Sequence, residues 1–188
     1  MEVGHGVGVD LGLLVLRLVL GGFVAAHGIQ KLTYWWGGTG LAGSTAEFRA
    51  DGFMGGVWTA LLAGLTQVGA GALLVLGLLT PAAAAGIIGV MTVATTVKVR
   101  VGFWSQDGGF EYPLFLALLG VGLSWTGPGG WSLDRVVGLT GYLADHDVAT
   151  WVSLAATVLG IGAALLLRVV LHRDELEQHP VPTTGGVA

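Results

Sequence analysis

The chain has 188 residues, of which 53% are hydrophobic and 11% are charged, and its mean hydropathy is +0.77. Soluble domains usually carry charge on about a quarter of their residues, so this composition excludes an ordinary soluble domain and indicates a membrane protein. The net charge of -4 comes without a basic stripe, which argues against a nucleic-acid partner, and the absence of cysteine excludes disulfides, thiolate metal sites and cysteine redox chemistry.

Apolar segments follow one another along the chain, and most are long enough to cross a membrane as helices. A helix needs about 20 apolar residues to span a hydrocarbon core of about 30 Å. The segments are residues 11–30, 57–79, 82–101, 110–125 and 150–171. The fourth is the shortest, and we count it as a short span because Trp125 and Trp131 lie at one end and Trp104 and Phe110 lie near the other, as expected at membrane interfaces. The lipid bilayer is therefore the first partner that we predict.

The connections between these segments also carry structural signals. The first segment lacks a basic n-region and a cleavage site, so we expect it to be retained as a span. The motif GLLTP at residues 77–81 predicts a tight antiparallel turn. Ser44 and Glu47 have the spacing of a capping box, which predicts a short interfacial helix between residues 33 and 56, and we expect Ser132 to cap a second short turn.

These signals divide the chain into a membrane core with extensions at both ends. The predicted parts are an N-terminal segment 1–10, a core 11–135, an interfacial loop 136–149, an additional membrane helix 150–171 and a polar, disordered tail 172–188. Small residues let helices approach closely in lipid. The positions that we expect at such helix contacts are Gly64, Gly71, Ala156, Gly160 and Ala164.

The distribution of lysine and arginine predicts the orientation of a multi-pass protein in the cell membrane. The larger basic group lies on the side shared by the first loop, the third loop and the C-terminus. Its members are Lys31, Arg49, Lys98, Arg100, Arg168 and Arg173. The positive-inside rule therefore places the C-terminus in the cytoplasm.

Polar side chains inside the spans are candidate functional residues, because burying them in hydrocarbon is costly. His27 and Lys31 are four residues apart and share one helix face. His27 could hydrogen-bond to a ligand or a neighbouring helix while Lys31 supplies positive charge, or Lys31 could simply reach the interface. Gln67 lies in the middle of the second span, where an interhelical hydrogen bond worth about 0.6 to 2 kcal/mol is the alternative to a ligand contact.

A second group of polar residues is expected on the same membrane side. Lys98 and Arg100 are two residues apart and therefore face different ways. Glu111 stands at a helix start, where the helix dipole favours a carboxylate, but it could also join a salt-bridged cluster with the nearby cations. Tyr112 belongs to an aromatic group that reads either as an interfacial belt or as part of a quinone pocket. His27 is the only histidine within a span, so we predict no metal site and cannot place a haem.

Several motifs in a fixed order resemble one family of small membrane proteins. They are HGIQKL, AEFRADGF, LLAGLTQVGAGALLVLGLLTP, GGFEYPLFLALLGVGL and GPGGWSLD. Together they cover about residues 11–135 and are similar to the DoxX family. The resemblance implies an all-α, four-helix membrane bundle, to which residues 150–171 add a fifth transmembrane helix.

The same resemblance implies a link to redox chemistry. The related DoxD proteins are subunits of a thiosulfate:quinone oxidoreductase, and other members are associated with oxidative-stress complexes. His27, Lys31 and Glu111 match positions at which family members commonly carry polar groups. Gln67 stands where many members have an acidic residue, so a mechanism that needs a carboxylate proton acceptor there is in doubt.

Two hypotheses of function follow. In the first, the chain is a membrane subunit linked to quinone-coupled redox chemistry, and a polar pocket holds a quinone head group or a small sulfur oxyanion. The residues proposed for that pocket are His27, Lys31, Gln67, Lys98, Arg100, Glu111 and Tyr112. In the second, the chain is a non-catalytic structural or assembly subunit of a larger membrane complex or a homo-oligomer, and the small-residue face of the last span docks a partner. The residues do not decide whether the chain is itself an enzyme.

Overall fold

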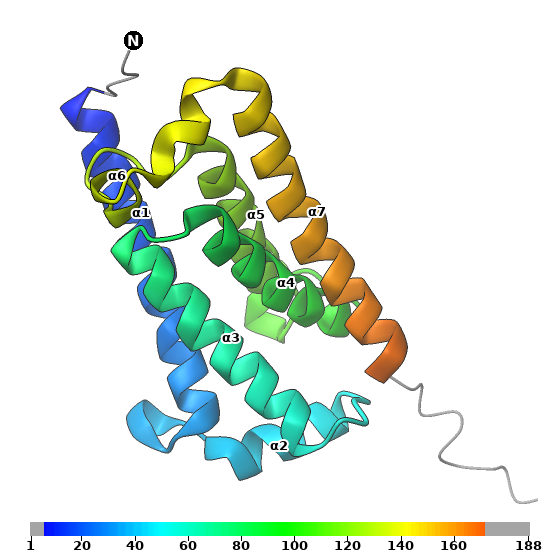
Figure 1. Ribbon diagram of the computed structural model, residues 1–188. Coiled ribbons are helices and arrows are strands. Elements are labelled where there is room, and N and C mark those ends of the chain that lie inside the picture. The colour runs from blue at the N-terminus through cyan, green and yellow to red at the C-terminus, as the bar shows by residue number, and fades with distance from the viewer. Residues whose placement is uncertain (1–5, 172–188) are drawn as a thin grey trace, which may run out of the picture.

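The protein folds as an all-α bundle, shown in Figure 1. The computed structural model describes residues 6–171, so the predicted disordered tail 172–188 lies outside the described residues. The long helices are α1 (Val7–Leu32), α3 (Val57–Leu76), α4 (Thr80–Lys98), α5 (Glu111–Thr126) and α7 (His146–Leu171). The connections contain α2 (Gly40–Ala50), α6 (Leu133–Val136) and the 3-10 turns η1 (Trp35–Gly37), η2 (Ser105–Asp107) and η3 (Leu139–Ala144).

The long helices have the apolar character of membrane spans. Four of those that the structure describes, α1, α3, α4 and α7, are long and apolar enough to cross a bilayer. α5 is the shortest of the long helices, with 16 residues. Large apolar side chains such as Leu65 and Phe23 are more than half exposed on the outer surface, as lipid contact requires. The prediction of a helical membrane bundle is therefore confirmed.

α1 and α3 approach each other through glycine. A Cβ atom built at Gly28 would lie 2.7 Å from the carbonyl oxygen of Gly64, and one built at Gly71 would lie 2.5 Å from that of Gly21. No side chain fits at such distances, so these glycines allow the two backbones to pack directly. The structure thus places Gly64 and Gly71 at the α1–α3 contact.

α7 packs on α4 through its small residues. Ala156, Gly160 and Ala164 are buried, and a Cβ built at Gly160 would lie 2.7 Å from the carbonyl oxygen of Ala85. Ser153 of the same face donates a hydrogen bond of 2.8 Å to the carbonyl oxygen of Ser124 on α5. The face on which the assembly hypothesis places a partner is therefore occupied within the chain.

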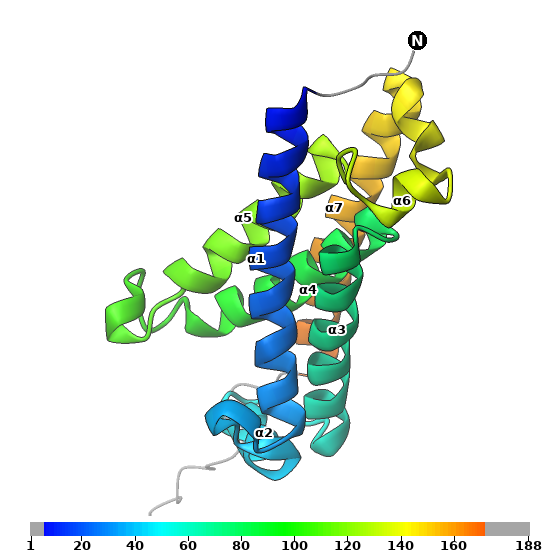
Figure 2. The same ribbon diagram turned by 90° about the vertical axis from the view of Figure 1, so that its left-hand side faces the viewer.

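α4 and α5 form a hairpin that runs at a steep angle to α1. Figure 2 shows the connection between these two helices projecting sideways, away from α2. Both α3 and α7 pack on α4, so α4 becomes the shared floor between them. In a simple up-and-down bundle, α2 and the α4–α5 connection would lie together on one side of the membrane. The angle of the hairpin separates them here.

The sequence predicted one turn, at Gly77, and two helix caps, at Ser132 and Ser44, and the structure agrees with the first two. Gly77 ends α3 in the left-handed conformation with φ 62°, and Ser132 caps α6 by accepting a hydrogen bond from the Arg135 N–H at 3.3 Å, so both predictions are confirmed. The predicted capping box at Ser44 is wrong, because α2 already begins at Gly40. Ser44 is instead buried and donates a 3.0 Å hydrogen bond to the carbonyl oxygen of Lys31 at the end of α1.

A polar clamp holds the opposite end of the bundle, where α1 begins. Arg17 of α1 is fully buried and donates a hydrogen bond to the carbonyl oxygen of Trp131. Asp134 is also buried, attracts the Arg17 guanidinium electrostatically, and accepts hydrogen bonds from the N–H groups of Leu79 at 2.7 Å and Thr80 at 2.9 Å. The clamp therefore ties the loop after α5 to both α1 and the start of α4.

Replacing Arg17 by methionine should destabilise the protein strongly. The change removes the bond to the loop and leaves the buried Asp134 without its compensating charge, for which we expect a loss of about 3 to 5 kcal/mol in the free energy of unfolding. Thermal unfolding in detergent measures this loss of stability. The control is Arg49→Met, at an exposed position of α2, which should change stability by less than about 0.5 kcal/mol. Equal stability of the two variants would contradict the clamp.

Candidate functional site

A cleft lies between α3 and α7, with α4 as its floor and α2 at its mouth. Its volume is about 900 Å³. Ligand-binding sites commonly have volumes of about 300 to 1,000 Å³, so this cleft is at the large end of that range. It is the best candidate site in the described part of the chain.

The walls of the cleft differ in chemistry. The α4 wall is apolar from Ala85 to Val97, and the α7 wall is apolar from Leu159 to Leu171. The polar side chains between the mouth and the deep end all come from α3, and they are Thr59, Thr66 and Gln67. An occupant can therefore make hydrogen bonds on one side only.

Gln67 is the central polar group of the cleft. Its side chain is 4% exposed, and its Oε1 atom has no hydrogen-bond partner among the described residues. The interhelical hydrogen bond expected as its structural role is therefore not made by this oxygen. Thr59, closer to the mouth, also has a buried hydroxyl oxygen without a partner. A buried polar group left in this state costs about 1 to 3 kcal/mol, so both atoms are ready to bind a complementary group.

Charged residues surround the mouth of the cleft. Lys31 Nζ lies 3.9 Å from the Glu47 carboxylate and 5.2 Å from the centre of the Phe48 ring. Lys98 Nζ donates a 3.2 Å hydrogen bond to the carbonyl oxygen of Gly108. With Asp51, the described residues at the mouth are two cations and two anions, so their formal charges balance. This balance favours a neutral occupant.

His27 lies outside the cleft, on the side of α1 that meets α5. Its Nε2 atom is 3.3 Å from the hydroxyl oxygen of Tyr112, and the two rings make an edge contact with centroids 6.0 Å apart. Glu111 accepts hydrogen bonds from the N–H and the hydroxyl of Ser105, both at 3.1 Å. His27, Tyr112 and Glu111 therefore all have partners within the protein, and their positions need no ligand to explain them.

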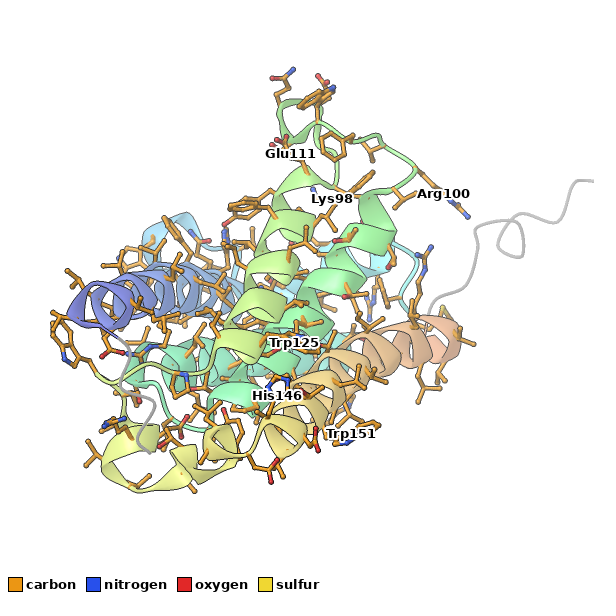
Figure 3. All side chains as sticks on the ribbon, turned by 90° about the horizontal axis from the view of Figure 1, so that it is seen from above. Lys98, Arg100, Glu111, Trp125, His146 and Trp151 are labelled. Atoms are coloured by element: carbon orange, nitrogen blue, oxygen red, sulfur yellow. The ribbon has the colours of Figure 1, made fainter. Side chains whose placement is uncertain are left out.

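The structure thus separates the residues that the sequence grouped into one pocket. Lys31, Gln67 and Lys98 line the cleft. His27, Glu111 and Tyr112 belong to the α1–α5 side. Figure 3 shows Lys98, Arg100 and Glu111 at the projecting end of the α4–α5 hairpin, and Arg100 is not part of the cleft lining. The angle of this hairpin is the cause, because it carries the start of α5 away from α2.

A smaller cavity lies beside the polar clamp at the other end of the bundle. Its volume is about 230 Å³, and Asp134 and Tyr142 contribute to its lining. Burial and the Asp134 charge raise the pKa of Tyr142 to about 12, so its hydroxyl is neutral at physiological pH. Arg17 Nε and Nη1, Thr80 Oγ1 and Tyr142 Oη lack partners in the described structure. The cavity is below the usual size of organic ligand sites but has room for water.

Sequence reasoning overlooked this clamp and the apolar wall of α7. Arg17 lies within the first apolar segment, but the sequence suggested no role for it, because its partner Trp131 is 114 residues away. A signal was present in the motif GPGGWSLD, whose Asp134 and Trp131 both belong to the clamp. The α7 wall gave no signal, since a row of small and branched apolar residues is normal in any membrane helix.

Comparisons with known proteins agree on one group of membrane proteins. The family model described as DoxX matches residues 12–100, which contain most of α1 and all of α2, α3 and α4. An uncharacterized membrane protein of Mycobacterium tuberculosis is 31% identical over 134 residues, which correspond to 65% of this chain and 79% of that protein. No solved structure matches the chain. The family model thus includes the α3 and α4 walls of the cleft but not α7.

Gln67→Leu should stabilise the protein when no ligand is present. Leucine removes an unpaired buried oxygen and keeps a similar volume, so we expect the free energy of unfolding in detergent to rise by about 1 kcal/mol. The matched control is Gln30→Leu, which removes a formed 2.8 Å hydrogen bond to the carbonyl oxygen of Trp36 and should lower stability. A similar loss in both variants would mean that Gln67 has a structural bond.

Tyr142 should ionise at a higher pH than an ordinary tyrosine does. The ultraviolet difference between wild type and Tyr142→Phe should show ionisation with a midpoint near pH 12. Because the folded-state pKa is raised, the contribution of Tyr142 to stability is complete below the ordinary pKa of 10.0 and is lost as the pH rises to about 12. A midpoint near pH 10 would show that the hydroxyl is not buried beside Asp134.

Proposed function

The chain belongs to the DoxX family, and from this premise we propose that it is a membrane subunit linked to quinone-coupled redox chemistry. Its cleft between α3, α4 and α7 binds the head group of a membrane quinone. The process served is the oxidation of sulfur compounds or the response to oxidative stress, as the resemblance to DoxD-type subunits implies. Other subunits of a membrane complex are its partners.

The unpaired side-chain oxygen of Gln67, in an apolar cleft, is the observation that carries this proposal. A quinone carbonyl accepts hydrogen bonds, whereas the corresponding quinol hydroxyl donates them. The amide of glutamine has both a donor and an acceptor, so Gln67 can bind either redox state. The apolar walls of α4 and α7 suit the rest of a lipid-soluble ligand.

The cleft supports a quinone better than a sulfur oxyanion. An anion would lose its hydration between apolar walls, and the balanced charges at the mouth offer it no net attraction. Because the chain has no cysteine, electrons would reach the quinone through a bound cofactor or a partner. A sulfur substrate would then react on that partner.

The assembly hypothesis has less support. It depended on the face formed by Ala156, Gly160 and Ala164, which packs on α4 inside the chain. A partner subunit would have to contact another face of the bundle. We therefore base the function on the cleft, with partners as an additional requirement of the redox role.

Quinone binding should depend on Gln67 and not on His27. We expect purified protein in nanodiscs to bind a benzoquinone with a decyl tail, detected by quenching of tryptophan fluorescence. Gln67→Leu should weaken this binding about tenfold, which corresponds to about 1.4 kcal/mol, because it removes the hydrogen bond to the head group.

The control is His27→Ala, which should bind normally because His27 contacts Tyr112 outside the cleft. Binding that is lost in His27→Ala and retained in Gln67→Leu would place the ligand on the α1–α5 side. Absence of quinone binding in the wild type would refute the proposed function.

A further inference from the structure

The cleft is much longer than a single ring requires. It extends along α3 from Thr59 near the mouth to Gln67 at the deep end, a separation of eight residues or about 12 Å of helix. Its volume of about 900 Å³ is also at the large end of the range for ligand sites. A head group bound at Gln67 therefore occupies only part of the space.

The remaining space is bounded by hydrocarbon. Val90, Val93 and Val97 line it from α4, and Ala163 and Leu167 line it from α7. These side chains have no hydrogen-bonding atoms, so a polar extension of the ligand would lose its hydration without compensation. A hydrocarbon chain meets no such penalty.

The positions of the polar groups set the direction of the ligand. The unpaired Gln67 oxygen is at the deep end, and the charged residues Lys31, Glu47 and Lys98 are at the mouth. A lipid with its head at the mouth would place its tail against Gln67 and leave that oxygen unpaired. A head group at Gln67 that carries a hydroxyl, as a quinol does, can donate a hydrogen bond to the oxygen, and the tail then runs along α4 and α7.

The tail has an exit into the bilayer. α3 and α7 both pack on α4, and Figure 1 shows α4 between them. The cleft is lined by residues of all three helices. The end of α7 closes the mouth, because its Leu171 carbonyl oxygen accepts a 2.8 Å hydrogen bond from the Met54 N–H. The opening between α3 and α7 therefore faces lipid.

α7 is held firmly enough to act as a fixed wall. Besides the contact with Met54, Arg168 donates a 2.9 Å hydrogen bond to the carbonyl oxygen of Thr96 on α4. Ser153 holds the other half of α7 to Ser124. Substitution of a side chain that points into the cleft should therefore change the cleft and not the position of the helix.

We infer that α7 determines ligand specificity by binding the hydrocarbon tail of the ligand. The ligand class is a neutral lipid with a hydrogen-bonding head at Gln67 and a long tail that passes Ala163 and Leu167 before it enters the bilayer between α3 and α7. The inference rests on the proposed function for the identity of the head group. It assigns recognition of the tail to a helix that the family model does not include.

The test compares two benzoquinones with the same head, one with a decyl tail and one with a methyl group in its place. Ala163→Phe fills the tail path, since Ala163 is exposed to the cleft. The overlap should weaken binding of the decyl probe about tenfold, as insertion of excess volume into a packed site does, and leave the methyl probe unchanged. Affinities in nanodiscs are corrected for the partition of each probe into lipid.

The matched control is Ala155→Phe, the same change at an exposed alanine of α7 that does not line the cleft, and it should bind both probes normally. Leu167→Trp tests the same path if Ala163→Phe does not fold. Two results would overturn the inference while the proposed function stands. In the first, the path variants bind each probe as tightly as the wild type does. In the second, Ala155→Phe weakens binding of the decyl probe as much as the path variants do. If the wild type binds neither probe, the proposed function fails and the inference fails with it.

Discussion

A hydrogen-bonding group in a hydrocarbon environment is costly unless it has a partner, and this constraint governs both ends of the protein. At one end, Arg17 and Asp134 are buried together and bind the backbone of the loop that follows α5. Arg17 Nε and Nη1 have no partner among the described residues, and Asp134 also lines a cavity of about 230 Å³ that has room for water. Towards the other end, Gln67 in the middle of α3 faces a cleft of about 900 Å³. The same cost therefore supports a structural lock at the first place and, in the proposed function, ligand binding at the second.

Close helix packing makes this division possible. Glycine contacts such as Gly28 with Gly64 bring α1 against α3, and Gly160 brings α7 against α4. α4 consequently supports α3 on one side and α7 on the other, and the space between those two helices becomes the cleft. The clamp also ties down the start of α4, because Asp134 accepts hydrogen bonds from the N–H groups of Leu79 and Thr80. The same helices thus carry the structural contacts and line the cleft of the proposed function.

Much of the fold could be predicted from local sequence, whereas the site could be predicted only in part. Hydropathy located the long helices, and the glycine at residue 77 and Ser132 marked their turns, because each signal acts within a few residues. The capping box at Ser44 failed because the helix already begins at Gly40. His27 and Lys31 share a helix face in sequence but have different neighbours, since α5 crosses α1 near His27 while α2 lies beside Lys31. The angles at which helices cross depend on contacts between segments that are far apart in the sequence. The spacing of residues within one helix carries no information on those contacts.

The central claim is that Gln67 binds the head of a lipid-soluble ligand whose tail lies along α7. An electron density map of the protein purified in native membrane lipid tests it most directly. The account predicts elongated density in the cleft, with one end within hydrogen-bonding distance of the Gln67 amide and the other passing Ala163 toward the bilayer between α3 and α7. A cleft closed by its own side chains, or density that enters it without reaching Gln67, would contradict the account.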